Sequence, residues 1–124
     1  MTEKLEIYKC EICGNIVEVL YEGAETLVCC GEPMILIEEK ISDEGKEKHV
    51  PVIDNNKVKV GSIPHPMQED HFIEWIEASN GKETSRIFLK FGQKPEAEFT
   101  FKPKYARIHC NIHGLWKSEQ KNEG

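Results

Sequence analysis

Apolar and polar residues alternate in short segments along the second two thirds of the chain. The clearest examples are residues 57–61, 72–77 and 105–110. Alternation places every second side chain on one face of an extended strand, so these segments predict half-buried β-strands. Turn sequences rich in Asn, Asp, Ser and Gly separate them at 54–56 and 79–81, and the second of these predicts a hairpin.

The pattern as a whole predicts a mainly β fold. Further strands are expected at 50–52, 87–91 and 97–101, and no segment has the apolar spacing of a long helix. Roughly seven short strands with regular turns are typical of an antiparallel sandwich of the immunoglobulin-like type. Several aromatic residues are expected to fill its core or to line a site: Trp75, Phe88, Phe99, Phe101 and Trp116.

A polar, turn-like segment at 41–46 separates this sandwich from a smaller module. We therefore predict two domains, residues 1–38 and residues 39–124. Between its cysteine pairs the smaller module contains apolar runs at 16–20 and 27–28, which predict two short strands joined by a turn. The polar tail from residue 117 to residue 124 is expected to fray.

Two cysteine pairs in the smaller module form a candidate metal site. The first is the knuckle Cys10-Glu11-Ile12-Cys13-Gly14, and the second is Cys29-Cys30-Gly31. Four thiolates suit tetrahedral zinc or iron, and the spacing alone leaves both metals open. The adjacent pair must reach one metal from consecutive residues, which requires a bent backbone. So short a module has little core, and the metal is expected to hold it folded.

Composition narrows the functional classes. The chain has 124 residues and a formal net charge of −6. All of this charge comes from residues 1–38, which contain two lysines and eight acidic residues. The absence of a basic stripe argues against nucleic-acid binding. The N-terminus lacks the apolar region of a signal peptide, and no apolar run is long enough to cross a membrane, so a cytoplasmic protein is expected. Its five cysteines then favour metal ligation over disulfides.

The fifth cysteine opens a second candidate site. Cys110 ends the apolar face of the strand at 105–110, and His113 follows on a turn for which Gly114 is suited. His109 lies on the opposite face of that strand and is assigned no ligand role. A single turn can therefore direct Cys110 and His113 toward one metal, although such a pair alone also occurs in structural zinc sites.

Three further histidines complete the candidate site. His65 lies between Pro64 and Pro66, whose fixed φ angles predict a stiff loop with the imidazole at its centre. His49 and His71 each precede an apolar segment. Four imidazoles and one thiolate suit iron better than magnesium or calcium and exceed what a tetrahedral zinc accepts. Five ligands leave a sixth position open, and the spacing does not offer two histidines with one carboxylate, the set typical of non-haem oxygenases.

These motifs resemble known metalloproteins. The four-cysteine module is similar to desulforedoxin, a rubredoxin-like module with one iron, and this resemblance favours iron over zinc. The segments Glu47-Lys48-His49-Val50-Pro51, His65-Pro66-Met67 with His71, and Cys110-Asn111-Ile112-His113-Gly114 resemble the iron site of superoxide reductase. The complete chain, with its motifs in this order, resembles the two-iron class called desulfoferrodoxin.

The resemblance implies an assignment for each site residue. Cys10, Cys13, Cys29 and Cys30 would bind the first iron. The second iron would have equatorial ligands His49, His65, His71 and His113 and an axial thiolate, Cys110. Lys48 would attract anionic superoxide, and Glu47 would be a sixth ligand to ferric iron.

The resemblance also implies a reaction and its partners. The reaction is one-electron reduction of superoxide to hydrogen peroxide without release of oxygen, which suits an anaerobe. Rubredoxin or a similar protein would be the electron donor, and a homodimer is expected. Two alternatives stay open on the residues alone. One is a zinc ribbon fused to a sandwich with incidental histidines, and the other is an electron carrier with iron in the four-cysteine module only.

Overall fold

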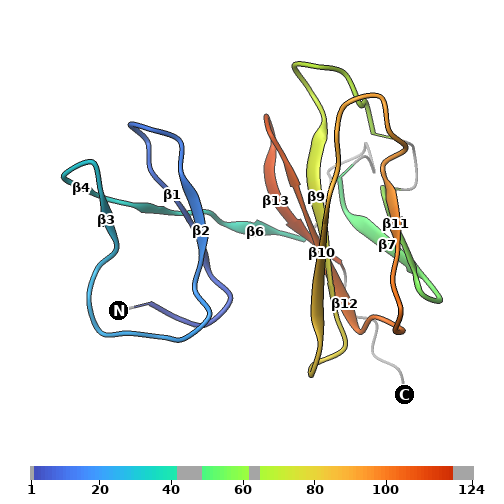
Figure 1. Ribbon diagram of the computed structural model, residues 1–124, viewed down its shortest axis with the longest axis horizontal. Coiled ribbons are helices and arrows are strands. Elements are labelled where there is room, and N and C mark those ends of the chain that lie inside the picture. The colour runs from blue at the N-terminus through green and yellow to red at the C-terminus, as the bar shows by residue number, and fades with distance from the viewer. Residues whose placement is uncertain (1, 42–48, 62–64, 119–124) are drawn as a thin grey trace. The chain divides into compact units, whose positions relative to one another are not determined.

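A computed structural model describes residues 2–41, 49–61 and 65–118. The described residues form strands and turns and contain no helix, which confirms the prediction of a mainly β fold. The chain divides into two compact units, Met1–Glu38 and Glu39–Gly124. Figure 1 labels most of the strands of each unit. Within the described part of the chain, no helix could serve as a membrane span.

The N-terminal unit is built from very short strands. Its three-stranded sheet has β1 (Ile7–Lys9) between β2 (Ile16–Glu18) and β5 (Ile35–Leu36), and both pairings are antiparallel. β3 (Val28–Cys29) pairs separately with β4 (Glu32–Pro33). The predicted strands at 16–20 and 27–28 therefore exist, but they belong to different sheets rather than to one hairpin.

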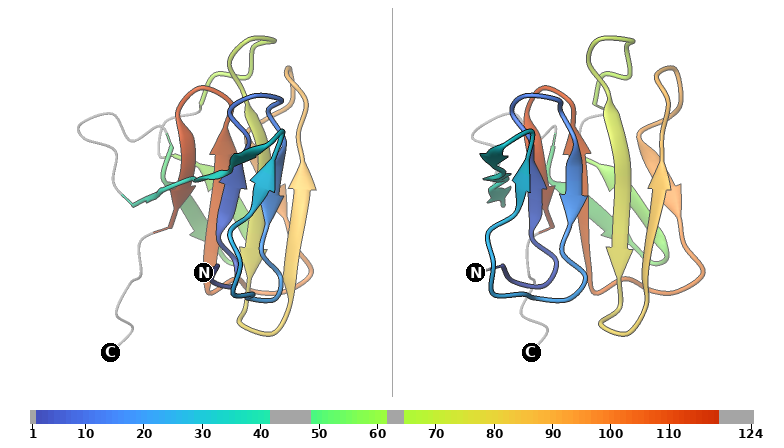
Figure 2. Two further views of the ribbon diagram at one scale, coloured as in Figure 1. Left: turned by 90° about the vertical axis from the view of Figure 1, so that its left-hand side faces the viewer. Right: turned by 60° about the vertical axis from the view of Figure 1, so that its left-hand side comes forward.

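The second unit contains a five-stranded sheet in the order β10-β9-β12-β13-β6. Neighbours pair antiparallel except β6, which runs parallel to β13. Figure 2 shows these strands from two further directions. The strand bounds are β10 (Thr84–Phe88), β9 (Ile73–Ser79), β12 (Tyr105–Cys110), β13 (Gly114–Lys117) and β6 (Glu39–Lys40).

A three-stranded antiparallel sheet forms the second layer of this unit. Its order is β11 (Glu96–Glu98), β8 (Lys57–Val60) and β7 (Pro51–Asp54). The core lies between the two sheets, because the apolar positions of their alternating strands face one another. Eight of its side chains are at most 1% exposed: Val58, Val60, Ile73, Ile76, Ala78, Ala106, Ile108 and Cys110.

Three details of the sequence prediction were wrong. The strand expected at 87–91 ends at Phe88, whose side chain is 73% exposed rather than in the core. No strand was predicted at β13, although it pairs with β12 from Gly114 onward. The tail does not fray from residue 117: Ser118 is buried, donates its backbone amide to the Ala106 carbonyl and accepts the Ala106 amide on its hydroxyl. The linker at 42–46 and residues 119–124 lie outside the described residues.

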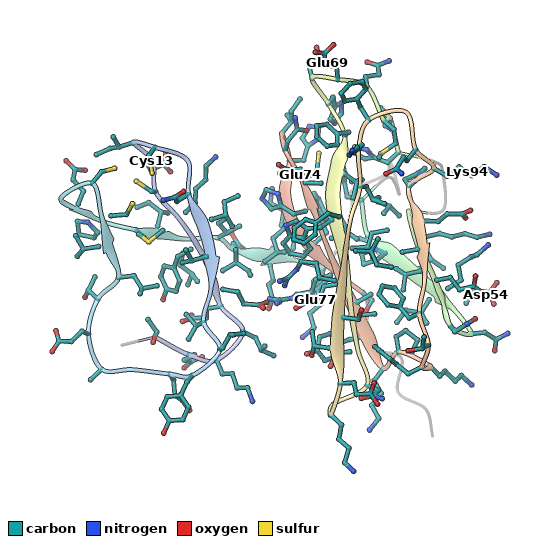
Figure 3. All side chains as sticks on the ribbon, viewed as in Figure 1. Cys13, Asp54, Glu69, Glu74, Glu77 and Lys94 are labelled. Carbon is teal, nitrogen blue, oxygen red and sulfur yellow. The ribbon has the colours of Figure 1, made fainter. Side chains whose placement is uncertain are left out.

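The face of the five-stranded sheet opposite the core carries a buried ionic cluster. Glu77 on β9, which Figure 3 labels, pairs with Arg107 on β12 and with Arg86 on β10. The side chains of Glu77 and Arg107 are 1% and 2% exposed. Glu39 on β6 adds a second carboxylate 3.2 Å from Arg107. This cluster joins four strands through charge-assisted hydrogen bonds.

Candidate metal centres

The four cysteines of the N-terminal unit lie together, with ligand atoms within 4.8 Å of one another. Cys10 and Cys13 come from the turn that follows β1, and Cys29 and Cys30 come from the end of β3. The Sγ atom of Cys29 lies 3.6 Å from that of Cys13 and 3.9 Å from that of Cys30. Figure 3 labels Cys13 beside the other sulfur atoms of this unit. The spacing motif therefore produces one compact group of thiols.

The backbone bends where the adjacent pair requires it. Cys30 has a positive φ of 55°, an uncommon value for a residue with a side chain, and Gly31 follows with 76°. Gly14 has a φ of 85° after the first pair. The left-handed conformation of Gly14 and Gly31 turns the chain back after each pair. The Cys13 amide donates to the Cys10 sulfur over 3.4 Å.

The thiols differ in their readiness to ionise. The backbone amide of Cys13 is the main cause that lowers the pKa of Cys10 to about 6. The neighbouring thiols of Cys13 and Cys10 raise the pKa of Cys30 to about 12, and they also raise that of Cys29. Four such sulfurs all ionise only when a cation compensates their mutual repulsion. The donor set thus fits a tetrahedral metal held by thiolates.

Four imidazoles form a closed ring in the second unit. Ring centroids are 4.7 Å apart for His49 and His65, 4.8 Å for His65 and His71, 5.0 Å for His71 and His113, and 4.6 Å for His113 and His49. Each imidazole contacts two others edge-on, so His49 faces His71 across the ring and His65 faces His113. This is the arrangement of four ligands around a square plane.

Cys110 supplies a fifth donor to the same ring. Its Sγ lies 3.5 Å from His65 Nε2 and 3.7 Å from His113 Nδ1, which belong to opposite members of the ring. The ligand atoms of all five residues lie within 4.8 Å of one another, and the Cys110 side chain is fully buried. Burial raises the pKa of this thiol, whereas the backbone amides of His113 and Ile112 lower it. Those amides favour the thiolate that a metal needs.

The surroundings of His65 and His71 fit a metal bound among the five donors. His65 donates its Nδ1 hydrogen to the Pro66 carbonyl over 2.7 Å, which leaves a lone pair on Nε2. Desolvation lowers the pKa of His65 to about 4, so the ring is neutral at pH 7. His71 Nε2 is buried without a hydrogen-bond partner in the described structure. An unpaired buried nitrogen is costly unless something binds it, and a metal among the five donors would do so.

Asn111 fastens the loop of His71 to the turn of Cys110 and His113, a role that sequence reasoning missed. Its Oδ1 accepts the Phe72 amide over 3.0 Å, its Nδ2 donates to the Asp70 carbonyl over 3.0 Å, and its own amide donates to the Phe72 carbonyl over 3.3 Å. The side chain thus imitates a short piece of strand pairing. Asparagine in the Cys-x-x-His turn was the available signal, because Asn readily bonds backbone groups in turns.

Lys40 and Trp116 support His113, and neither residue had been assigned this role. The His113 carbonyl accepts one hydrogen bond from Lys40 Nζ at 2.9 Å and another from Trp116 Nε1 at 3.2 Å. Lys40 Nζ also lies 5.1 Å from the centre of a Trp116 ring. Trp116 was expected in the core or at the site wall and is found at the wall, stacked on His49.

Glu47 and Lys48 are outside the described residues. His109 is not in the ring, and its Nδ1 donates to Glu74 Oε1 over 2.6 Å. Its register with Trp75 on β9 places it on the sheet face opposite Cys110, in agreement with the alternation of the sequence.

Comparison with known proteins identifies the family. Residues 2–37 match the family model described as "Desulfoferrodoxin, N-terminal domain", and residues 41–119 match the one described as "Desulfoferrodoxin". The chain belongs to the desulfoferrodoxin family. A desulfoferrodoxin homolog from Archaeoglobus fulgidus is 57% identical over 124 residues, which cover 95% of this chain and 99% of the relative.

Other relatives of this chain are named superoxide reductases. The one from Pyrococcus abyssi is 38% identical over 109 residues, which cover 68% of this chain and 95% of the relative. The crystal structure of the superoxide reductase from Treponema pallidum aligns with a TM-score of 0.79 at 26% identity, over 94% of this chain and 98% of that one. The two groups of donors match the two-iron domains of desulfoferrodoxin.

Proposed function

We propose that this protein is a superoxide reductase. It would catalyse the reaction of one superoxide, one electron and two protons to one hydrogen peroxide, without release of oxygen. The observation that carries the proposal is the closed ring of four imidazoles with the buried Cys110 sulfur against two opposite members. Four nitrogen donors and one thiolate suit iron and leave a sixth position for substrate.

This geometry supports the proposed ligand roles. His49, His65, His71, His113 and Cys110 would hold the iron. When bound, ferrous iron would supply the electron, and the thiolate ligand would increase its electron density. The chain's own residues hold the donors ready: the Pro66 carbonyl fixes the tautomer of His65, and the amides of His113 and Ile112 favour the Cys110 thiolate.

Glu47 and Lys48 complete the proposed site. Lys48 adjoins the ligand His49, and a lysine there would attract an anionic substrate. Glu47 would be a sixth ligand to ferric iron at rest. We expect Lys48→Ala to slow superoxide reduction and to remove its dependence on salt, with Lys82→Ala in the distant β9–β10 hairpin as the control. Unchanged kinetics of Lys48→Ala in stopped-flow or pulse radiolysis would refute the attraction of substrate by Lys48.

The partners belong to the same proposal. Cys10, Cys13, Cys29 and Cys30 would bind the first iron, in the domain of residues 1–38, and the catalytic iron would belong to the domain of residues 39–124. Rubredoxin or a similar protein would deliver the electron. A homodimer in the cytoplasm of an anaerobe fits the family and the reaction.

The first test combines metal analysis with the visible spectrum, on the wild type and on Cys110→Ser. Two irons per chain are expected, with an absorption band that appears on oxidation and is absent from Cys110→Ser. The purified protein should then consume superoxide with formation of hydrogen peroxide and no oxygen. Zinc in place of iron would indicate a structural ribbon on a sandwich. A single iron whose spectrum is the same in the wild type and in Cys110→Ser would indicate an electron carrier instead.

A further inference from the structure

Two side chains of opposite charge contact the segment of residues 109–113, which contains the buried Cys110. Lys40 comes from the edge strand β6, and Glu74 comes from β9. We infer that Lys40 and Glu74 are an opposed pair of positioning residues that shift the reduction potential of the metal at Cys110 in opposite directions. This inference rests on the proposed iron site and gives Lys40 and Glu74 an electrostatic role there.

Lys40 acts through the turn that carries two ligands. Its ammonium group donates to the carbonyl of His113, three residues after Cys110, over 2.9 Å. The parallel pairing of Lys40 with Trp116 fixes the lysine backbone on this edge of the sheet. The same ammonium lies 5.1 Å from a Trp116 ring centre, and the indole holds the charge above its face. A cation is therefore kept beside the Cys110 turn, although its side chain is solvent-exposed.

Glu74 acts through the residue that precedes the thiolate. Its Oε1 accepts the Nδ1 hydrogen of His109 over 2.6 Å. His109 is 5% exposed and stacks on Trp75, with ring centroids 5.8 Å apart and an interplanar angle of 16°. The carboxylate itself is 36% exposed. A negative charge is thus held beside the backbone of Cys110 by a packed imidazole, on the sheet face opposite the histidine ring.

Both charges contact the segment of residues 109–113, which contains Cys110: Lys40 binds the His113 carbonyl, and Glu74 binds the His109 ring. Charges held this close to a bound metal change the energy of its oxidation. Oxidation adds a positive charge to the site, so a nearby cation opposes oxidation and a nearby carboxylate favours it. Because both side chains touch water, salt should weaken each effect.

The test measures the potential of the thiolate-ligated iron by spectroelectrochemistry at low ionic strength. Lys40→Met is expected to lower the potential and Glu74→Gln to raise it. The double variant should return close to the wild type, and Lys40→Arg should leave the potential in place because it keeps the charge. Two matched controls should not move it. Lys117→Met removes a lysine of β13 that lies over the ring of Tyr105. Glu96→Gln removes a carboxylate of β11 whose exposure is similar to that of Glu74.

Shifts of opposite sign that shrink as salt is added would support the inference. No shift in Lys40→Met or Glu74→Gln, or shifts of the same sign, would overturn it. Weaker metal binding by Lys40→Met without a change in potential would also overturn it, because that result indicates a purely structural hydrogen bond. The potential is measured independently of turnover. An iron site that shows these shifts but does not consume superoxide would therefore reject the proposed function and retain the inference.

Discussion

The indole of Trp116 lies almost parallel to the imidazole of His49, with ring centroids 4.7 Å apart and an interplanar angle of 13°. The same indole donates to the carbonyl of His113. One aromatic side chain thus orients two adjacent members of the histidine ring, one by stacking and one by a hydrogen bond. Residues of this kind decide how well a metal site is preorganised.

Replacement of Trp116 should weaken metal binding in the second unit. Trp116→Leu removes both the stack and the donor, and we expect about a 10- to 100-fold loss of affinity, the usual cost of removing such support. Trp116→Phe keeps a ring against His49 and should lose less. Competition with a chelator measures the metal affinity of both variants. Trp75→Phe is the control, because the Trp75 ring stacks on His109, which is not a proposed ligand. Wild-type affinity in Trp116→Leu would contradict this prediction.

Asn111→Ala should also loosen the site. The variant loses both side-chain hydrogen bonds to the backbone of residues 70 and 72, so the His71 loop is no longer fastened to the Cys110 turn. We expect roughly a 10-fold faster release of the metal from this site and no change at the four-cysteine site.

Asn80→Ala is the matched control for Asn111→Ala. Asn80 also accepts two backbone amides, those of Lys82 and Glu83, but in the β9–β10 hairpin. Equal metal release from both variants would mean that loss of turn hydrogen bonds, rather than the position of Asn111, explains the effect.

The metal-free protein should lose stability as the pH falls below the pKa of an ordinary histidine. Desolvation holds the pKa of His65 at about 4 in the fold, against an ordinary 6.5. Between these values the unfolded chain binds more protons, so the free energy of unfolding decreases as pH is lowered from 6.5 to about 4. Urea unfolding at several pH values measures this slope, and the slope should be shallower in His65→Gln. Identical slopes would show that His65 does not contribute.

The buried pair of Glu77 and Arg107 should be important for stability. Glu77→Leu leaves the Arg107 charge buried without its main partner, and we expect a loss of about 3–5 kcal/mol in the free energy of unfolding. Glu96→Leu breaks a surface pair with Lys57, whose charged atoms are 3.9 Å apart, and should cost at most about 1 kcal/mol. Denaturant titration of both variants tests the difference, and similar losses would argue against a special role for the buried pair.

The sequence predicted those parts of the protein that have a local signal. Alternation identified β12 with its correct bounds, because Ala106, Ile108 and Cys110 point into the core. Cysteine and histidine spacing found both groups of donors, because few other roles require such residues together. The very short strands of the N-terminal unit gave weaker signals, and their pairing could not be inferred from periodicity.

The supporting residues were missed because their roles depend on neighbours distant in sequence. Lys40 meets the His113 carbonyl, 73 residues away in the chain, only because β6 joins β13 in parallel. Asn111 reaches residue 70 across 41 positions. Phe88 was misplaced for a related reason: its strand lies at the edge of the sheet, where an aromatic side chain can remain exposed.

The two centres differ greatly in the length of chain that each encloses. The cysteine ligands span residues 10–30, whereas the histidine ring joins residues as distant as His49 and His113. During synthesis, the first centre can be complete before most of the sandwich exists. The ring must wait until β12 and β13 have paired, because their turn supplies Cys110 and His113. The ring also joins His49 to this turn. Contacts so distant in sequence form slowly, so metal capture would come last in the second unit.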